Sequence, residues 1–146
     1  MVPLRNEDGT AMVSARLLTR SRTVAQALFL TAAGPPPEGR LDWLVNEVED
    51  FLARAGSRSR FVVGLALFAV CLLAPLAVGS VRPLGRMSVE ERARALGRLE
   101  DVFGAPVLAV KALLSVIYYE HPEAARAVGF DGSCLLDEPR HLPSVP

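Results

Sequence analysis

The chain has 146 residues, of which 51% are apolar and 22% charged, and its 16 basic and 16 acidic side chains give a formal net charge of zero. This length suits one domain with short tails, and the apolar content is enough for a hydrophobic core. Because the basic excess typical of nucleic-acid-binding proteins is missing, the composition argues against a nucleic acid as partner.

The cysteines and histidines of the chain are too few to indicate a disulfide framework or a metal site. Cys71 lies in an apolar block, where it is most simply a small buried side chain, and Cys134 lies near the C-terminus. The possibility of a disulfide between them stays open, although two cysteines form no disulfide framework. His121 and His141 have no metal-ligand pattern around them, so we expect no metal site.

The N-terminal part begins with a stretch, 1–17, that mixes polar residues, Gly and Pro without periodicity, and we expect a flexible tail there. A first amphipathic helix is predicted over 18–32, ended by Gly34 and the prolines at 35–37. Basic residues before an apolar run loosely resemble a signal peptide. The adjacent arginine pair of a twin-arginine signal is missing, so we expect no export through this segment.

The stretch 41–54 has clear helical spacing, with apolar and charged side chains on opposite faces. Its apolar face is predicted to comprise Leu41, Leu44, Val45, Val48, Phe51 and Leu52. We expect this helix to stop at Gly56, and we expect 57–60 to be a short polar link to the next block.

The block 61–81, FVVGLALFAVCLLAPLAVGSV, holds no charged side chain, and as a helix it would span about 30 Å, the thickness of a bilayer's hydrocarbon core. Apolar side chains occur all round it, which is typical of a helix in lipid or at the centre of a helical domain. Arginines flank both ends, so the positive-inside rule sets no orientation. Pro75 predicts a kink or an early end. The candidate residues of this membrane or core helix are Phe61, Leu65, Phe68, Leu72 and Leu76.

A capping box formed by Ser88 and Glu91 predicts the start of the next helix, over 88–103. We expect its inward face to carry Leu96, Leu99, Val102 and Phe103.

The last helices are an apolar one over 106–119, with Pro106 in its first turn, and a short one that begins at Pro122 and is capped by Gly129. The first of these is too short to span a membrane, so we expect it to be buried in protein. No alternating strand pattern appears. The predicted fold is therefore all-α: a small helical bundle over 18–134 around the long apolar helix, with a disordered tail at 135–146.

The sequence shows no nucleophile–base constellation and no glycine-rich phosphate loop, which argues against a catalyst. Glu120 and His121 lie at a helix junction, where a surface turn is the simpler interpretation than an acid–base pair. Tyr118 and Tyr119 could stack on a ligand, but a helix end with both rings half in the core is the preferred interpretation.

Several short motifs follow one another in the C-terminal half. RMSVEER at 86–92 begins a leucine-rich helix, an apolar helix then ends in IYYEHP at 117–122, and VGFDG closes the pattern at 128–132. In this order the motifs resemble the gluconate 2-dehydrogenase subunit 3 family. They are equally similar to the helical region that precedes the FAD-binding domain in bacterial long-chain alcohol oxidases of the glucose–methanol–choline class. With the upstream helices, the resemblance covers residues 20–134.

The resemblance implies a non-catalytic small subunit that packs on a flavoprotein and helps its maturation, stability or export. It implies that FAD lies in the partner, an oxidoreductase of the glucose–methanol–choline class acting on an alcohol, sugar or sterol-like substrate, and that this chain binds no cofactor. The partner-binding candidates are Tyr118, Tyr119, His121 and Phe130. We expect a cytoplasmic protein, associated with the inner membrane if 61–81 contacts lipid.

Two other interpretations stay open. The chain could be a small membrane protein of unrelated role with one span at 61–81. It could also be a stand-alone ligand-binding protein or small enzyme, with an apolar pocket lined by Phe68, Leu72, Val110 and Leu114.

Overall fold

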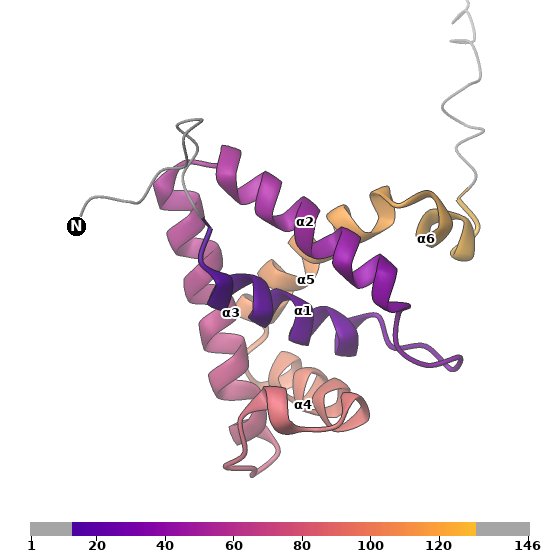
Figure 1. Cartoon of the computed structure of the whole chain (residues 1–146). Coiled ribbons are helices and arrows are strands. Elements are labelled where there is room, and N and C mark those ends of the chain that lie inside the picture. The colour runs from indigo at the N-terminus through magenta and orange to yellow at the C-terminus, as the bar shows by residue number, and fades with distance from the viewer. Residues whose placement is uncertain (1–12, 131–146) are drawn as a thin grey trace, which may run out of the picture.

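The computed structural model describes residues 13–130, which form six α-helices, one 3-10 turn and no strand (Figure 1). The helices are α1 (Ala15–Leu28), α2 (Glu38–Arg54), α3 (Ser57–Ala77), α4 (Val89–Val102), α5 (Gly104–Glu120) and α6 (Pro122–Ala127), with the 3-10 turn η1 (Leu84–Arg86) before α4. The predicted all-α bundle is confirmed. Cys134, His141 and the predicted tail at 135–146 lie outside the described residues.

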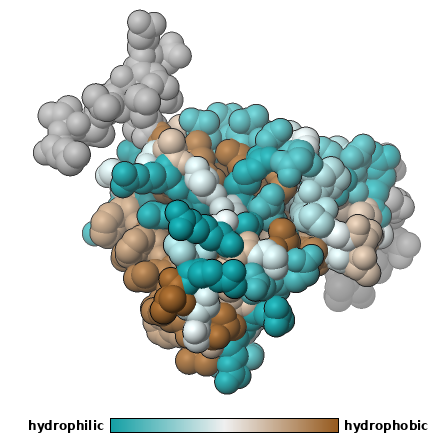
Figure 2. Space-filling view, turned by 60° about the horizontal axis from the view of Figure 1, so that its bottom comes forward, coloured by the Kyte–Doolittle hydropathy of each residue, from teal (hydrophilic) through white to brown (hydrophobic). Residues whose placement is uncertain are grey.

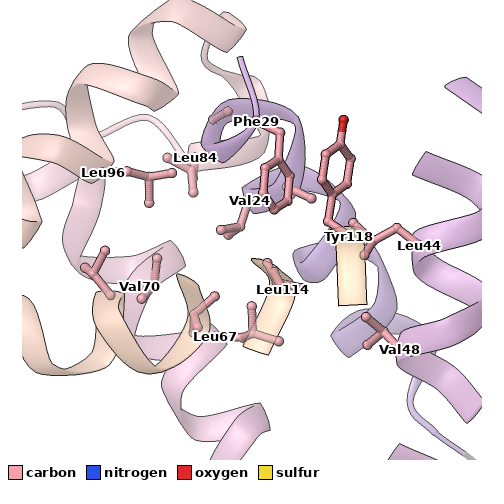
Figure 3. Close-up of a cluster of buried hydrophobic side chains, with 14 of the residues drawn as sticks. Val24, Phe29, Leu44, Val48, Leu67, Val70, Leu84, Leu96, Leu114 and Tyr118 are labelled. Carbon is pink, nitrogen blue, oxygen red and sulfur yellow. The ribbon is translucent and has the colours of Figure 1, made fainter. Parts of the chain in front are cut away.

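Helix α1 lies in the middle of the bundle and packs against α2, α3, α4 and α5 (Figure 1). It begins at Ala15, three residues before the predicted start, because the Ser14 carbonyl accepts hydrogen bonds from the amides of Leu17 and Leu18. Figure 3 shows that side chains from α1, α2, α3, α4 and α5 pack together in the core around α1. The central ones are Val24 (α1), Leu44 and Val48 (α2), Leu67 and Val70 (α3), Leu96 (α4) and Leu114 (α5).

Helix α2 follows the predicted periodicity closely, since Leu41, Leu44, Val48 and Leu52 are all fully buried. The prediction that Phe51 belongs to the buried face is wrong, because its ring is exposed at the edge of that face. An ion pair ties the other side of α2 to α1: the Arg22 guanidinium donates to Asp42 (2.6 Å) and to Glu38.

Helix α3 is shifted along the chain relative to the predicted block. The polar link predicted at 57–60 is wrong, because the amide of Arg60 donates to the Gly56 carbonyl and these residues form the first turn. The early end predicted from Pro75 is confirmed, since the helix stops at Ala77. The amide of Ser80 donates to the Pro75 carbonyl (2.9 Å), and Gly79 takes a left-handed conformation (φ 72°), which closes the helix with a Schellman motif.

The two faces of α3 differ sharply in burial. Leu67, Val70 and Ala74 are at most 1% exposed and pack against α1, α4 and α5. The opposite face carries the five predicted candidates, Phe61, Leu65, Phe68, Leu72 and Leu76, whose exposed fractions lie between 45% and 69%. The helix predicted at the centre of the bundle is therefore enclosed by its neighbours along one face only. By length and composition alone, α3 is able to cross a membrane.

The predicted capping box of α4 is confirmed: the Glu91 amide donates to Ser88 Oγ (3.2 Å), and the Ser88 amide donates to the Glu91 carboxylate (2.8 Å). Leu96 and Leu99 face the core as expected. Val102 and Phe103 do not, because α4 ends there and the non-helical backbone of Phe103 (φ −145°) turns the chain into α5.

Helix α5 begins at Gly104, two residues before the predicted start, with Pro106 in its first turn. It is buried along one face only. Val107, Val110, Leu114 and Ile117 are in the core, whereas Leu108 and Val116 are exposed, so the predicted burial in protein holds for one face of the helix only. Helix α6 starts at Pro122 and is followed by Gly129 in a left-handed conformation (φ 84°), as predicted.

Candidate partner-binding surfaces

The first candidate surface is a cleft of about 450 Å³ where the loop between α1 and α2 meets the ends of α5 and α6. The loop cannot be helical because it contains three successive prolines. It is closed by paired backbone hydrogen bonds between Thr31 and Gly34 (both 3.0 Å), with Gly34 in a left-handed conformation (φ 113°). Arg40, Tyr119 and Val128 line the opposite side of the cleft.

Tyr118 forms the floor of this region rather than a free surface. Its ring is buried and lies parallel to that of Phe29, with centroids 3.9 Å apart and planes within 8° of each other (Figure 3). Tyr119 is 40% exposed and meets Phe29 edge-on at 6.0 Å. The interpretation of a helix end with rings half in the core thus describes the pair well.

Arg40 of α2 connects three helices below the cleft. Its guanidinium donates to the hydroxyl of Tyr118 (3.2 Å) and to the carboxylate of Glu123 on α6 (3.3 Å). The hydrogen bond with Tyr118 is the main cause that raises the pKa of Arg40, so the group stays charged. Its Nε is buried without a hydrogen-bond partner among the described residues. Two hydrogen bonds of Arg40 therefore join the α5–α6 junction to α2.

His121 faces away from the cleft. Its ring meets the ring of Trp43 edge-on at 4.9 Å, and its Nδ1 accepts the amide of Glu123 (3.3 Å) at the N-terminus of α6. This confirms a structural turn at Glu120-His121, where the imidazole caps a helix and contacts an aromatic ring.

The exposed apolar side chains at this end are Tyr119, Val128 and Phe130, which we call the α5–α6 corner. Of the four predicted partner-binding residues, the structure therefore leaves Tyr119 and Phe130 accessible, buries Tyr118 and uses His121 as a cap. Val128 was not among the predicted residues, although it opens the VGFDG motif, because no local pattern shows that its side chain is exposed after the end of α6. Arg40 and Phe29 were missed because their contacts to Tyr118 join distant segments, which no local pattern reveals.

The second candidate surface is the exposed face of α3, which we call the outer face and define by Phe61, Leu65, Phe68, Leu72 and Leu76. Figure 2 shows apolar side chains gathered toward the lower left, while hydrophilic residues cover much of the rest of this view. A shallow hollow of about 370 Å³ lies between α3 and α5. Its lining is mostly apolar and includes Phe51 of α2, and the charged Arg58 also lines it.

Within residues 13–130, no group of three or more His, Cys, Asp or Glu side chains is arranged to hold a metal ion. The prediction of an apolar pocket between Phe68, Leu72, Val110 and Leu114 is wrong. Phe68 and Leu72 point outward on α3, whereas Val110 and Leu114 are buried in the core, so the four side chains do not share a cavity.

No protein-family model matches this chain, and no curated protein or solved structure shows significant similarity to it. The two surfaces and the motifs of the C-terminal half are therefore the features of this chain that bear on its function.

Proposed function

We propose that this chain is a non-catalytic accessory subunit that binds and stabilises a FAD-dependent oxidoreductase of the glucose–methanol–choline class. The substrate class of that partner would be an alcohol, a sugar or a sterol-like compound. The observation that carries the proposal is the α5–α6 corner, an exposed apolar surface built from the segment that resembles the gluconate 2-dehydrogenase subunit 3 family.

The corner has the composition and rigidity of a protein-binding surface. Tyr119 and Phe130 are aromatic, and aromatic side chains are enriched in the buried centres of protein interfaces. The stack of Tyr118 on Phe29 and the hydrogen bonds of Arg40 fix the end of α5 and the start of α6 before any partner binds. Such a surface loses little conformational entropy on association.

The proposal places FAD and the chemistry in the partner. The titratable side chains at the corner already have structural roles: Arg40 and Glu123 pair across α2 and α6, and His121 caps α6. We place the complex in the cytoplasm, at the inner membrane.

The test is purification of the full chain, carrying an affinity tag, from its native host. We expect a flavoprotein of the glucose–methanol–choline class to co-purify, identified by mass spectrometry and by the absorbance of its flavin. Val128→Glu puts a charge into the corner, and we expect it to lower partner recovery about tenfold or more, because a desolvated, unpaired charge opposes binding.

A matched control is Val102→Glu, since Val102 (69% exposed) resembles Val128 (62% exposed) but lies at the junction of α4 and α5. It should leave recovery unchanged. If no flavoprotein co-purifies with the wild-type chain, the proposed function is wrong. Equal losses in both variants would show that the corner is not the docking surface.

A second candidate is a single-span membrane protein of unrelated role, favoured by the length and composition of α3. A protein that resists alkaline extraction from native membranes and has no flavoprotein partner would support this alternative.

A further inference from the structure

We propose that the outer face of α3 binds the surface of an anionic lipid bilayer, with the helix lying in the membrane plane while it remains packed in the bundle. This inference goes beyond the accessory-subunit proposal and does not depend on it, because it concerns a different surface and a different partner.

The outer face has the geometry of an interfacial helix. Its five large apolar side chains recur at spacings of four, three, four and four residues, which places them on one side of the helix. From Phe61 to Leu76 they extend over about 22 Å. The core residues Leu67, Val70 and Ala74 lie on the opposite side. The helix is therefore able to enter a bilayer surface without leaving its neighbours.

A membrane-spanning orientation fits the structure less well. The apolar part of α3 runs from Phe61 to Ala77, about 25 Å of helix, which is short of the roughly 30 Å hydrocarbon core. Spanning would also pull Leu67 and Val70 out of the core and expose the buried faces of α1, α4 and α5. The in-plane orientation keeps these contacts.

The segment of the chain that contains α3 is strongly one-sided in charge. Residues 51–89 contain five arginines and no Asp, Glu or Lys, whereas the rest of the chain carries eleven basic and sixteen acidic side chains. Arg54 pairs with Asp50 (3.5 Å), and Arg82 pairs with Glu91 (3.0 Å). The other three, Arg58, Arg60 and Arg86, form no ion pair with any carboxylate of the described residues.

One arginine lies directly on the apolar surface. The guanidinium of Arg20 is 5.1 Å from the centre of the Phe68 ring, where a cation–π contact holds positive charge beside the outer face. Arg58 lines the neighbouring hollow between α3 and α5. Apolar side chains with an arginine rim are the composition of helices that bind anionic bilayers, where the guanidinium pairs with lipid phosphates.

The test is co-sedimentation of the purified full chain with vesicles. Vesicles of equimolar phosphatidylglycerol and phosphatidylcholine are compared with vesicles of phosphatidylcholine alone, at low and high salt. We expect binding to the anionic vesicles, weakened by salt because a shorter Debye length screens the arginines. We expect little binding to phosphatidylcholine alone.

Two variants separate the apolar from the charged contribution. Leu65→Ser combined with Leu72→Ser should weaken binding about 25-fold, since each half-exposed leucine contributes about fivefold. Arg58→Gln combined with Arg60→Gln should weaken binding to anionic vesicles by a similar factor, about fivefold for each charge. Val102→Ser, at the junction of α4 and α5, is the control, because it makes an exposed apolar side chain polar without changing the charge, and it should bind vesicles like the wild type. Circular dichroism checks that each variant keeps its helices.

The inference is overturned if the wild type does not bind anionic vesicles, or if the leucine variant binds as well as the wild type. It is also overturned if native membranes retain the chain through alkaline extraction, because that result indicates a span. If the leucine variant loses a flavoprotein partner and keeps vesicle binding, the outer face is a protein-binding surface instead. Failure of the flavoprotein proposal appears only in the co-purification experiment, so the two outcomes are distinguishable.

Discussion

Phe29 and Tyr118 lie ring against ring, 3.9 Å apart and nearly parallel, although one follows the first helix and the other belongs to the last turn of α5 (Figure 3). This stack joins the end of α1 to the end of α5. It also seals the floor of the cleft beside the α5–α6 corner, because both rings are buried.

Phe29→Ala should lower the free energy of unfolding by about 3 kcal/mol, because it leaves a cavity and removes the stacking partner of Tyr118. Urea denaturation followed by circular dichroism measures the loss. Phe130→Ala is the control: its ring is about half exposed, so we expect a change within about 0.5 kcal/mol. Similar losses in both variants would contradict a structural role specific to the stack.

Ser88→Ala should cost about 1 kcal/mol of stability, because it removes the side chain that accepts the Glu91 amide at the start of α4. Thr19→Ala is a suitable control, since Thr19 is exposed and its hydroxyl donates only to the Ala15 carbonyl within α1. Its effect on the urea midpoint should be small. A Ser88 variant as stable as the wild type would show that water accepts the hydrogen bond of the Glu91 amide equally well.

The same capping box predicts a pH dependence. The hydrogen bond from the Ser88 amide, and then the one from Arg82, lower the pKa of Glu91 in the folded state. A carboxylate with a depressed folded pKa stabilises the fold above its unfolded pKa, about 4.3, and this contribution is lost as the pH falls through the folded pKa. Glu91→Gln should therefore be less stable than the wild type at neutral pH, and the difference should shrink in acid.

The measurement is the urea midpoint of both proteins from neutral pH to about pH 3, a range that crosses the glutamate pKa. The neighbouring Glu90→Gln serves as a control, since Glu90 is exposed and Glu91 alone completes the capping box. A difference between wild type and Glu91→Gln that stays constant with pH would contradict this role of the carboxylate.

Gly97→Ala should stabilise the protein by about 0.8 kcal/mol, because Gly97 lies inside α4 and an added methyl group meets no atom within 4 Å. Gly79→Ala should have the opposite effect, a loss of about 1 kcal/mol, since the left-handed backbone that ends α3 disfavours a side chain. Thermal unfolding of the two variants measures the expected gain and the expected loss of stability. A stabilising Gly79→Ala would mean that α3 does not end in this motif.

The parts of the fold that were predictable from the sequence depend on local signals. In α2, the spacing of Leu41, Leu44, Val48 and Leu52 identifies the buried face, because one apolar face alternates with a charged one. The capping box of α4 joins residues three apart, so four consecutive residues are enough to recognise it. In each case the interacting groups are neighbours along the chain.

The two faces of α3 could not be distinguished in this way. Leu67 and Leu65 look equivalent in an apolar block, yet one is buried and the other exposed, because the choice depends on where α1, α4 and α5 pack. The prediction that Tyr118 belongs to a partner-binding surface was wrong for the same reason. Nothing next to Tyr118 in the sequence indicates that Arg40 and Phe29 bury its ring from two other segments.

The central position of α1 has a consequence for how the chain folds during synthesis. Helix α1 leaves the ribosome before the other described helices, but the side chains that cover it include Leu96 of α4 and Leu114 of α5, which are made later. At typical translation rates the interval is on the order of ten seconds. During that time only α2, then α3 and then α4 are available to shield its apolar face, so part of that face stays exposed on the nascent chain until α5 emerges.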